Sequence, residues 1–494
     1  NKVQENLLSR ESFLRTGNQF YNEIQESNAK NENHRLNLRG DHEFNKNNKL
    51  LFRTSLSYQN NDNLETTFGE TKSLEGLVLN RTQNQYSSLN KAFNLNNRFI
   101  YQHKFEKVGR TLSLELSNTY KPTDGDNLYT DLQQDSLIEY LSDENQYSFG
   151  TSINYTEPVG TNSQLSVEYD GNYLYRESDN DTYISQSVDD EGVFSQTLSN
   201  QFKSSYTTHV PSISFSKRRF GKFIRIKLAY QAAELDNKWL VPYENQSNRT
   251  FNNLLPSFMG RFELTKKINL FVRLAASTTE PSINQLQNVI NNSNPLFVTL
   301  GNSDLKQSNT NSLFFRLQGT KSEKNIVFSN SFNAQSSTDY IGSQTTVLSV
   351  DSTIADGVTL QEGAQITSPV NVDGYLNIRN TSTFGVLIKP IKNNFNTSLG
   401  LGYVKLPGIT NGISNIAETY SADLKFGLTS NISEKIDYNL FYQIVRSQVI
   451  NSIQQGVENS YYTQTLGLKL TLTLKNNFVF RNETNIQRDN GINN

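Results

Sequence analysis

Apolar and polar residues alternate with a period of two along several segments of the chain. The clearest segment is 465–474, where one side carries Leu466, Leu468, Leu470, Leu472 and Leu474. A period of two places successive side chains on opposite faces of a β-strand. The same alternation occurs at 50–58, 111–120, 222–230, 268–276, 395–403 and 436–444. The chain is therefore predicted to contain many strands with one apolar and one polar face.

The length and charge of these segments indicate where they lie. Each is about ten residues long, which matches a tilted strand that crosses a membrane, whereas strands of soluble sandwiches are about half as long. A dry core would not accept unpaired charges, but a lumen filled with water or a plug would. The polar faces carry Arg53, Glu115, Glu168, Arg225, Lys227, Arg273, Asp437 and Lys469. The pattern predicts an all-β fold, a large antiparallel transmembrane β-barrel.

Short and long connections alternate between the segments. Bacterial outer-membrane barrels show this alternation, with short turns on the periplasmic side and long loops outside the cell. The short polar turns lie at 45–48, 106–109, 157–162, 217–221, 265–267, 320–324, 389–394, 433–435 and 475–477. The long connections lie at 60–92, 122–144, 177–200, 235–250, 278–310, 337–370, 406–418 and 447–458. Counting the hairpins predicts roughly eighteen strands.

The order of short and long connections also orients the two ends of the chain. Residues 1–30 enter on the long-loop side, like an extracellular loop, and the strand at 478–487 heads outward from a short turn. Single-chain bacterial barrels have an even number of strands and must close, because an open edge leaves backbone groups unpaired in lipid. We therefore expect residues 1–494 to be one outer-membrane β-barrel domain from which strands at both ends are missing.

Composition narrows the class of protein. Of the 494 residues, 35% are hydrophobic but 11% are aromatic, which fits a barrel whose alternate residues face lipid. The absence of cysteine excludes a disulfide framework and thiolate chemistry. A net charge of −2 gives no field that attracts nucleic acid. Because neither a long apolar run nor a signal peptide is present, we expect no transmembrane helix and a mature or trimmed fragment.

Residues 251–320 resemble a specific family. Leu254-Leu255-Pro256-Ser257 opens a strand, and Glu280-Pro281, Gln285-Leu286, Asn294-Pro295-Leu296 and Gly301-Asn302-Ser303-Asp304-Leu305-Lys306 follow in the next connection. This order is similar to the outer-membrane β-barrel family of TonB-dependent receptors, in which an LLPS strand start precedes a loop of the form RP, QL, NP, GNP and LKPE. The chain departs from that form at Glu280, Ser303 and Gln307. Physically, the prolines and the Gly301-Asn302 turn predict an ordered extracellular loop over the barrel mouth.

The resemblance implies a fold and a function. Such receptors have a 22-strand barrel occluded by an N-terminal plug, and they import iron chelates, oligosaccharides or peptides with energy delivered by TonB. The roughly eighteen predicted strands would then be about the fourth to the twenty-first. The implied partners are outer-membrane lipid, a small nutrient and the TonB complex, which would bind through the missing N-terminal region. The alternative is a passive porin, or a barrel that serves secretion or adhesion without TonB.

Two aromatic residues are the candidate ligand contacts. Trp239, the only tryptophan, lies in a predicted extracellular loop close to Tyr243, where the two rings would form a platform for a sugar or chelate. The structural alternative for Trp239 is an anchor at the membrane interface. An acidic loop, with Asp179, Asp181, Asp189, Asp190 and Glu191, lacks EF-hand spacing and is interpreted as solvated.

Enzymatic chemistry is not expected. The four histidines have no zinc-ligand spacing, and the chain has no P-loop, nucleophile elbow or HExxH motif. Lumen carboxylates such as Glu115 and Glu168 are interpreted as partners that balance lumen Arg and Lys. The sequence predicts no catalytic residue, no metal site and no cofactor.

Overall fold

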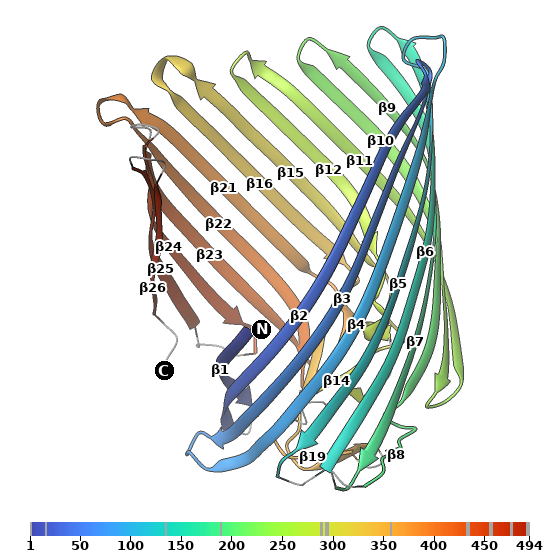
Figure 1. The fold of residues 1–494 in the computed structure, drawn as a ribbon, viewed down its shortest axis with the longest axis vertical. Coiled ribbons are helices and arrows are strands. Elements are labelled where there is room, and N and C mark those ends of the chain that lie inside the picture. Colours follow the sequence, from blue (N-terminus) through green and yellow to red (C-terminus); the bar gives the residue numbers. More distant parts are fainter. Residues whose placement is uncertain are drawn as a thin grey trace.

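The computed structural model is dominated by one curved antiparallel sheet (Figure 1). It describes residues 2–14, 17–133, 136–187, 190–286, 290–291, 296–355, 358–430, 435–453, 458–474 and 478–490. Nineteen long strands (β1–β7, β9–β12, β15–β16 and β21–β26) follow one another as antiparallel neighbours and form the barrel wall. The predicted fold class, a large antiparallel barrel, is confirmed.

The wall strands differ about twofold in length. The long ones are β2 (Gly17–Asn45), β3 (Asn48–Ser73), β4 (Val78–Lys104), β5 (Thr111–Asp131), β6 (Ser136–Gly160), β7 (Ser163–Ser185), β9 (Asn200–Arg219), β10 (Lys222–Val241) and β11 (Asn245–Thr265). The shorter ones are β1 (Lys2–Leu14), β12 (Ile268–Thr279), β15 (Ser308–Lys321), β16 (Ile326–Thr338), β21 (Tyr375–Ile388), β22 (Asn393–Thr410), β23 (Ile413–Ser430), β24 (Ile436–Asn451), β25 (Glu458–Thr473) and β26 (Val479–Asn490).

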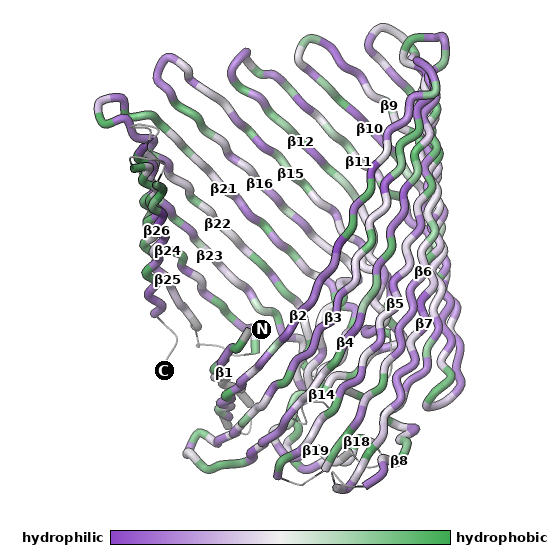
Figure 2. The backbone as a smooth tube through the Cα atoms, viewed as in Figure 1, coloured by the Kyte–Doolittle hydropathy of each residue, from purple (hydrophilic) through white to green (hydrophobic). Residues whose placement is uncertain are grey.

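Strand register fixes which side chains face lipid and which face the lumen. Directly paired residues of an antiparallel sheet lie on the same face, so Leu274, Leu313, Ala334 and Ile378 form one apolar row across β12, β15, β16 and β21. The next row carries Arg273, Phe314, Asn333 and Arg379 on the opposite face. Figure 2 shows hydrophobic and hydrophilic positions alternating along the wall strands. The predicted alternation is therefore confirmed as an apolar outer face and a polar lumen.

Ion pairs line the lumen. The Glu168 carboxylate lies 2.6 Å from the Lys227 amine and 3.9 Å from the Arg225 guanidinium. Glu115 contacts Arg98 at 2.6 Å. These lumen charges have partners, and the predicted role of Glu115 and Glu168 in balancing lumen Arg and Lys is confirmed.

The predicted short turns that the structure describes, from 45–48 to 389–394, lie together at one end of the wall, which is the top of Figure 1. Residues 433–434 and 475–477, in the last two predicted turns, lie outside the described residues. The turn between β9 and β10 consists of Phe220 and Gly221, both with positive φ. A Cβ atom on Gly221 would lie 2.2 Å from the Glu263 carboxylate, so only glycine fits there. Lys267, in the turn at 266–267, lies 2.7 Å from Glu323, in the turn at 322–325. This ion pair lowers the pKa of the Glu323 carboxyl.

Several predictions about the opposite end were wrong. The connections predicted at 60–92, 122–144, 235–250 and 406–418 are mostly strand. The reason is that the flanking wall strands stay paired beyond the predicted ends, as β3 and β4 do out to Lys72 and Val78. Residues 2–14, predicted as part of a loop, form β1 and pair with β2. The physical reason is that a paired backbone outside the membrane needs no apolar face, so these hydrated strands lose the alternation that identifies a transmembrane segment.

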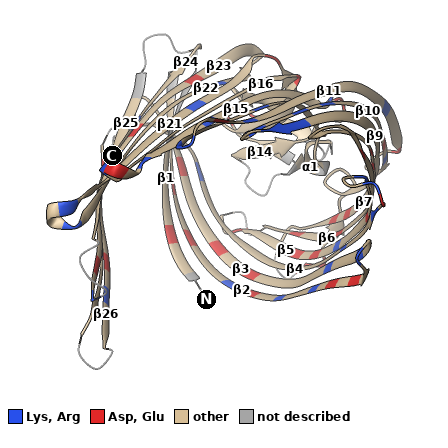
Figure 3. Ribbon diagram, turned by 90° about the horizontal axis from the view of Figure 1, so that it is seen from above, with Lys and Arg blue, Asp and Glu red and all other residues tan. Residues whose placement is uncertain are grey.

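The sheet is open along one side, as Figure 3 shows from above. Among the described residues, β1 pairs only with β2, and β26 pairs only with β25. The further strands predicted at both ends, which would close the barrel, remain a prediction. In the part of the chain that the structure describes, no helix has the length and apolarity to cross a membrane.

Two connections fold back inside the curve of the sheet, where Figure 3 places α1 and β14. We call α1 (Ile283–Leu286), β13 (Ile290–Asn291), β14 (Phe297–Leu300), β17 (Tyr340–Val347) and β20 (Gln365–Val372) the infolded layer. β14 pairs with β13 on one side and in parallel with β20 on the other, and β20 also pairs with β17. The remaining short elements are β8 (Val193–Phe194), β18 (Ser352–Ala355), β19 (Val358–Leu360), η1 (Ser322–Lys324) and η2 (Lys389–Ile391).

Candidate functional site

The block that carries the family resemblance anchors the infolded layer to the wall. Leu286 and Leu305 are 1% and 0% exposed. Their side chains belong to one buried cluster with inner-face residues of β7, β9 and β10, namely Leu174, Phe202, Tyr206, Ala233, Leu235 and Trp239. The block therefore has a structural role, as predicted, but it lies against the inner wall instead of over the mouth. Asn294 and Pro295 lie outside the described residues.

Hydrogen bonds hold the same block in place. Arg249 of β11 donates to the Leu305 carbonyl and to the Asp304 carboxylate, each at 2.8 Å. The Gln307 amide donates to the Tyr206 hydroxyl, and Asn253 donates to the Gln307 side-chain oxygen at 3.1 Å. Gln307 stands where the family form has a proline, and its amide makes bonds that a proline could not make. The departure at this position is therefore accommodated by the wall.

A cavity of about 570 Å³ lies between the wall and the infolded layer, and we call it the lumen chamber. Its wall side consists of Tyr86, Asn127, Tyr140, Ser142, Glu144, Asn180, Thr182 and Leu198. Its layer side consists of Asn284, Gln285, Ile290, Thr299, Leu300, Gly301, Ile341, Gly342, Ser343, Thr367, Ser368 and Pro369. Its volume falls in the range typical of small-molecule sites.

The chamber is almost uncharged, and its lining mixes hydroxyls and amides with apolar side chains. Glu144 is the only charged side chain among the lining residues that the structure describes. Glu144 lies in the part of β6 that projects beyond the membrane, and burial raises the pKa of its carboxyl. The side-chain oxygen of Asn127 is buried and accepts no hydrogen bond from any described residue. An unpaired buried acceptor is costly, so this atom is suited to bind a donor from a ligand.

Sequence reasoning named Gln285 and Gly301 of the layer side but did not find the wall side of the chamber. Asn127 and Tyr140 fell inside the connection predicted at 122–144, but they are inward-facing positions of β5 and β6. The pattern that could have identified them is the period of two, which continues beyond the membrane with tyrosine and amides at the inward positions. That signal is weak without the strand register, because both faces are polar there.

Trp239 lies on the inner face of β10, with 5% of its surface exposed. Its ring packs 5.4 Å from the ring of Phe202 in the buried cluster that holds Leu286 and Leu305. The alternative interpretation as a membrane-interface anchor is therefore wrong, because Trp239 points away from lipid. Whether Trp239 contacts a ligand stays a prediction.

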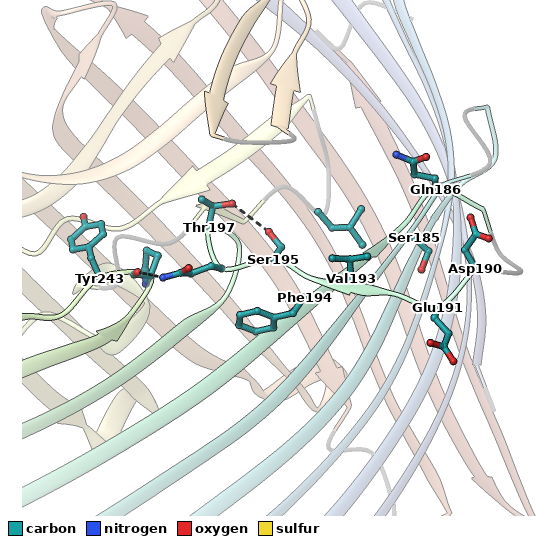
Figure 4. Close-up of a pocket in the computed structure, with 12 residues that line it drawn as sticks. Ser185, Gln186, Asp190, Glu191, Val193, Phe194, Ser195, Thr197 and Tyr243 are labelled. Carbon is teal, nitrogen blue, oxygen red and sulfur yellow. Dashed lines mark hydrogen bonds between the residues drawn. The ribbon is translucent and has the colours of Figure 1, made fainter.

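Tyr243 is 60% exposed and lines a second cavity of about 980 Å³, shown in Figure 4. The other lining residues come mainly from the connection around β8. Gln196 of that connection donates to the Pro242 carbonyl at 2.8 Å, so the two connections meet beside Tyr243. The two predicted residues meet only at a small cavity of about 10 Å³, which both line, while Tyr243 also borders the open pocket and Trp239 does not. A ligand contact at Tyr243 also stays a prediction.

The acidic loop has no metal-binding arrangement in the described part of the chain. No group of three or more His, Asp or Glu side chains could hold a metal ion there. Asp190 and Glu191 line the pocket of Figure 4, at the opposite end from Tyr243. Asp189 lies outside the described residues.

Long tilted strands, an apolar outer face, an ion-paired lumen and short turns at one end together define a large outer-membrane β-barrel. The chain belongs to the outer membrane protein beta-barrel family, whose family model matches residues 103–494. The protein is therefore located in the outer membrane of a Gram-negative-type bacterium. No curated protein matches the chain.

Solved structures of several outer-membrane proteins resemble the chain. The siderophore receptor PirA from Acinetobacter baumannii is 13% identical over 97% of this chain and 74% of its own, with a TM-score of 0.49. The ferric citrate transporter FecA is 8% identical over 98% and 78%, with a TM-score of 0.47. The copper transporter OprC is 10% identical over 98% and 79%, with a TM-score of 0.48. Family membership rests on the family model alone.

Proposed function

We propose that the chain is the barrel of a TonB-dependent receptor that imports a scarce nutrient across the outer membrane. The observation that carries this proposal is the lumen chamber, a small-molecule cavity inside the barrel wall. The block between Pro256 and Lys306, which resembles these receptors, supports it because its Leu305 fixes the layer that encloses the chamber. In this proposal the chain binds and passes a ligand and carries out no reaction.

The alternative function is a passive porin, or a barrel that serves secretion or adhesion. The ion-paired lumen around Glu168 and Lys227 suits a water-filled channel as well as a plugged one. The receptor function is favoured by the infolded layer, which narrows the lumen and creates a binding cavity. TonB coupling is proposed from the family resemblance, and the N-terminal segment that would contact TonB is proposed to precede this chain.

Conductance and uptake distinguish the two functions. The full-length gene product, reconstituted in planar bilayers, is expected to conduct almost nothing, because a plug would occlude the lumen. Cells that carry the gene should take up the nutrient only while TonB is functional. Steady conductance together with uptake that persists in a TonB deletion strain would show that the barrel is a porin.

A further inference from the structure

The lumen chamber has a lining that is almost free of charge. Its side chains are mostly hydroxyls, amides and tyrosines, and they come from both the wall and the infolded layer. No Lys or Arg is among the lining residues that the structure describes. An anionic ligand, such as a ferric chelate with several carboxylates, would lose its hydration there without gaining a cation. The chamber chemistry therefore disfavours an anionic ligand.

The lining offers acceptors for hydroxyl groups. The buried oxygen of Asn127 accepts nothing from any residue described in the structure, and Glu144 adds two further carboxyl oxygens on the next strand. An acceptor in a buried site gains most from a ligand that brings its own O–H or N–H donors. A ligand with several hydroxyls satisfies Asn127 and Glu144 together without bringing a charge.

Two tyrosines add aromatic surface to the apolar surface that Leu198, Ile290, Leu300 and Ile341 already provide. Tyr86 of β4 and Tyr140 of β6 both line the chamber. Aromatic rings combine a large apolar face with a polar tip, so they bind ligands that have both apolar C–H surfaces and hydroxyls. Sugar rings have that combination.

An extended peptide fits the chamber less well. Peptides often bind by adding a strand to an exposed sheet edge. Two layer strands, β14 and β20, border the chamber through Thr299 and Thr367, and both of these residues are paired on both sides. At these two positions the strands therefore offer side chains but no free backbone ladder.

From these observations we propose that the lumen chamber binds an uncharged, polyhydroxylated ligand, a neutral oligosaccharide. Asn127 and Glu144 accept hydrogen bonds from its hydroxyls, and Tyr86 and Tyr140 pack against its rings. This inference rests on the proposed receptor function and names the ligand class of the same cavity.

Calorimetric titration of the purified full-length receptor tests the proposal. The probes are neutral tri- to hexasaccharides of glucose, galactose, mannose and xylose, with ferric citrate and an uncharged tripeptide as competing classes. Asn127→Leu removes the acceptor and keeps the side-chain size, and Tyr140→Ala removes a ring. Each is expected to weaken oligosaccharide binding by roughly tenfold, since about 1.4 kcal/mol corresponds to a factor of ten.

Tyr147→Ala is the matched control, because Tyr147 lies on the same strand as Tyr140 and is 46% exposed on the outer face. It should leave binding unchanged, and heat-modifiable gel mobility confirms that every variant folds. The proposal is overturned if ferric citrate or the tripeptide binds and no oligosaccharide does, if nothing in the panel binds, or if all three variants behave alike. None of these results affects the receptor function, which fails only on steady conductance and TonB-independent uptake.

Discussion

Replacing Leu305 with alanine is expected to loosen the part of the infolded layer around residues 301–307 from the barrel wall. Leu305 is completely buried between wall residues such as Phe202 and Trp239 and the neighbouring Leu286. Truncation of a buried leucine to alanine costs about 2–5 kcal/mol, because it removes apolar contacts and leaves a cavity. Hydrogen exchange of the backbone amides at 301–307 in lipid nanodiscs measures the effect as a lower free energy of local opening.

The effect should be local, because the wall strands keep their own pairing when the layer opens. Val350→Ala is the control, since Val350 is 65% exposed in the connection between β17 and β18. It should leave exchange at 301–307 unchanged. Equal exchange in both variants would contradict the anchoring role assigned to Leu305.

The transmembrane wall was predictable because lipid imposes a strict pattern. A residue such as Leu466 faces hydrocarbon while Lys469 faces the lumen, and the contrast is visible in the sequence alone. The short turns were predictable for a related reason, because glycine and polar residues cluster where the chain reverses. Both signals come from local residue choice, which sequence reasoning reads directly.

The parts of the long wall strands that extend beyond the membrane were not predictable in this way. Asn60 and Gln85 lie in paired strands, but no lipid covers the outer face there, so no alternation is required. Their strand conformation depends on continued pairing with the neighbouring strand, which begins inside the membrane. Tertiary continuity therefore overrode a composition that is typical of loops.

The chamber was hidden for a third reason. Tyr86 and Gly301 are 215 positions apart in the sequence, and only the infolding of two connections brings them to one cavity. The burial of Trp239 has the same origin, because its partners Leu286 and Leu305 arrive from a distant connection. The motif block at 251–320 indicated the family to which this connection belongs, but long-range packing determines where the connection lies in the fold.

Replacing Leu468 with arginine puts a charge on the lipid face of β25 and is expected to destabilise the barrel by up to about 2–4 kcal/mol, the cost of an arginine at the membrane midplane. Leu468 is 37% exposed, and the register pairs it with Leu440 of β24 and Thr484 of β26. The adjacent change Lys469→Leu alters the lumen face, where the lysine lies 3.8 Å from Glu483 and is 66% exposed, so it should be tolerated. Urea unfolding in lipid vesicles, followed by heat-modifiable mobility, compares the two variants. Residues 468 and 469 are neighbours on one strand. The difference between the unfolding free energies of the two variants therefore reports whether a side chain faces lipid or the lumen. Equal losses would mean that β25 does not separate lipid from lumen.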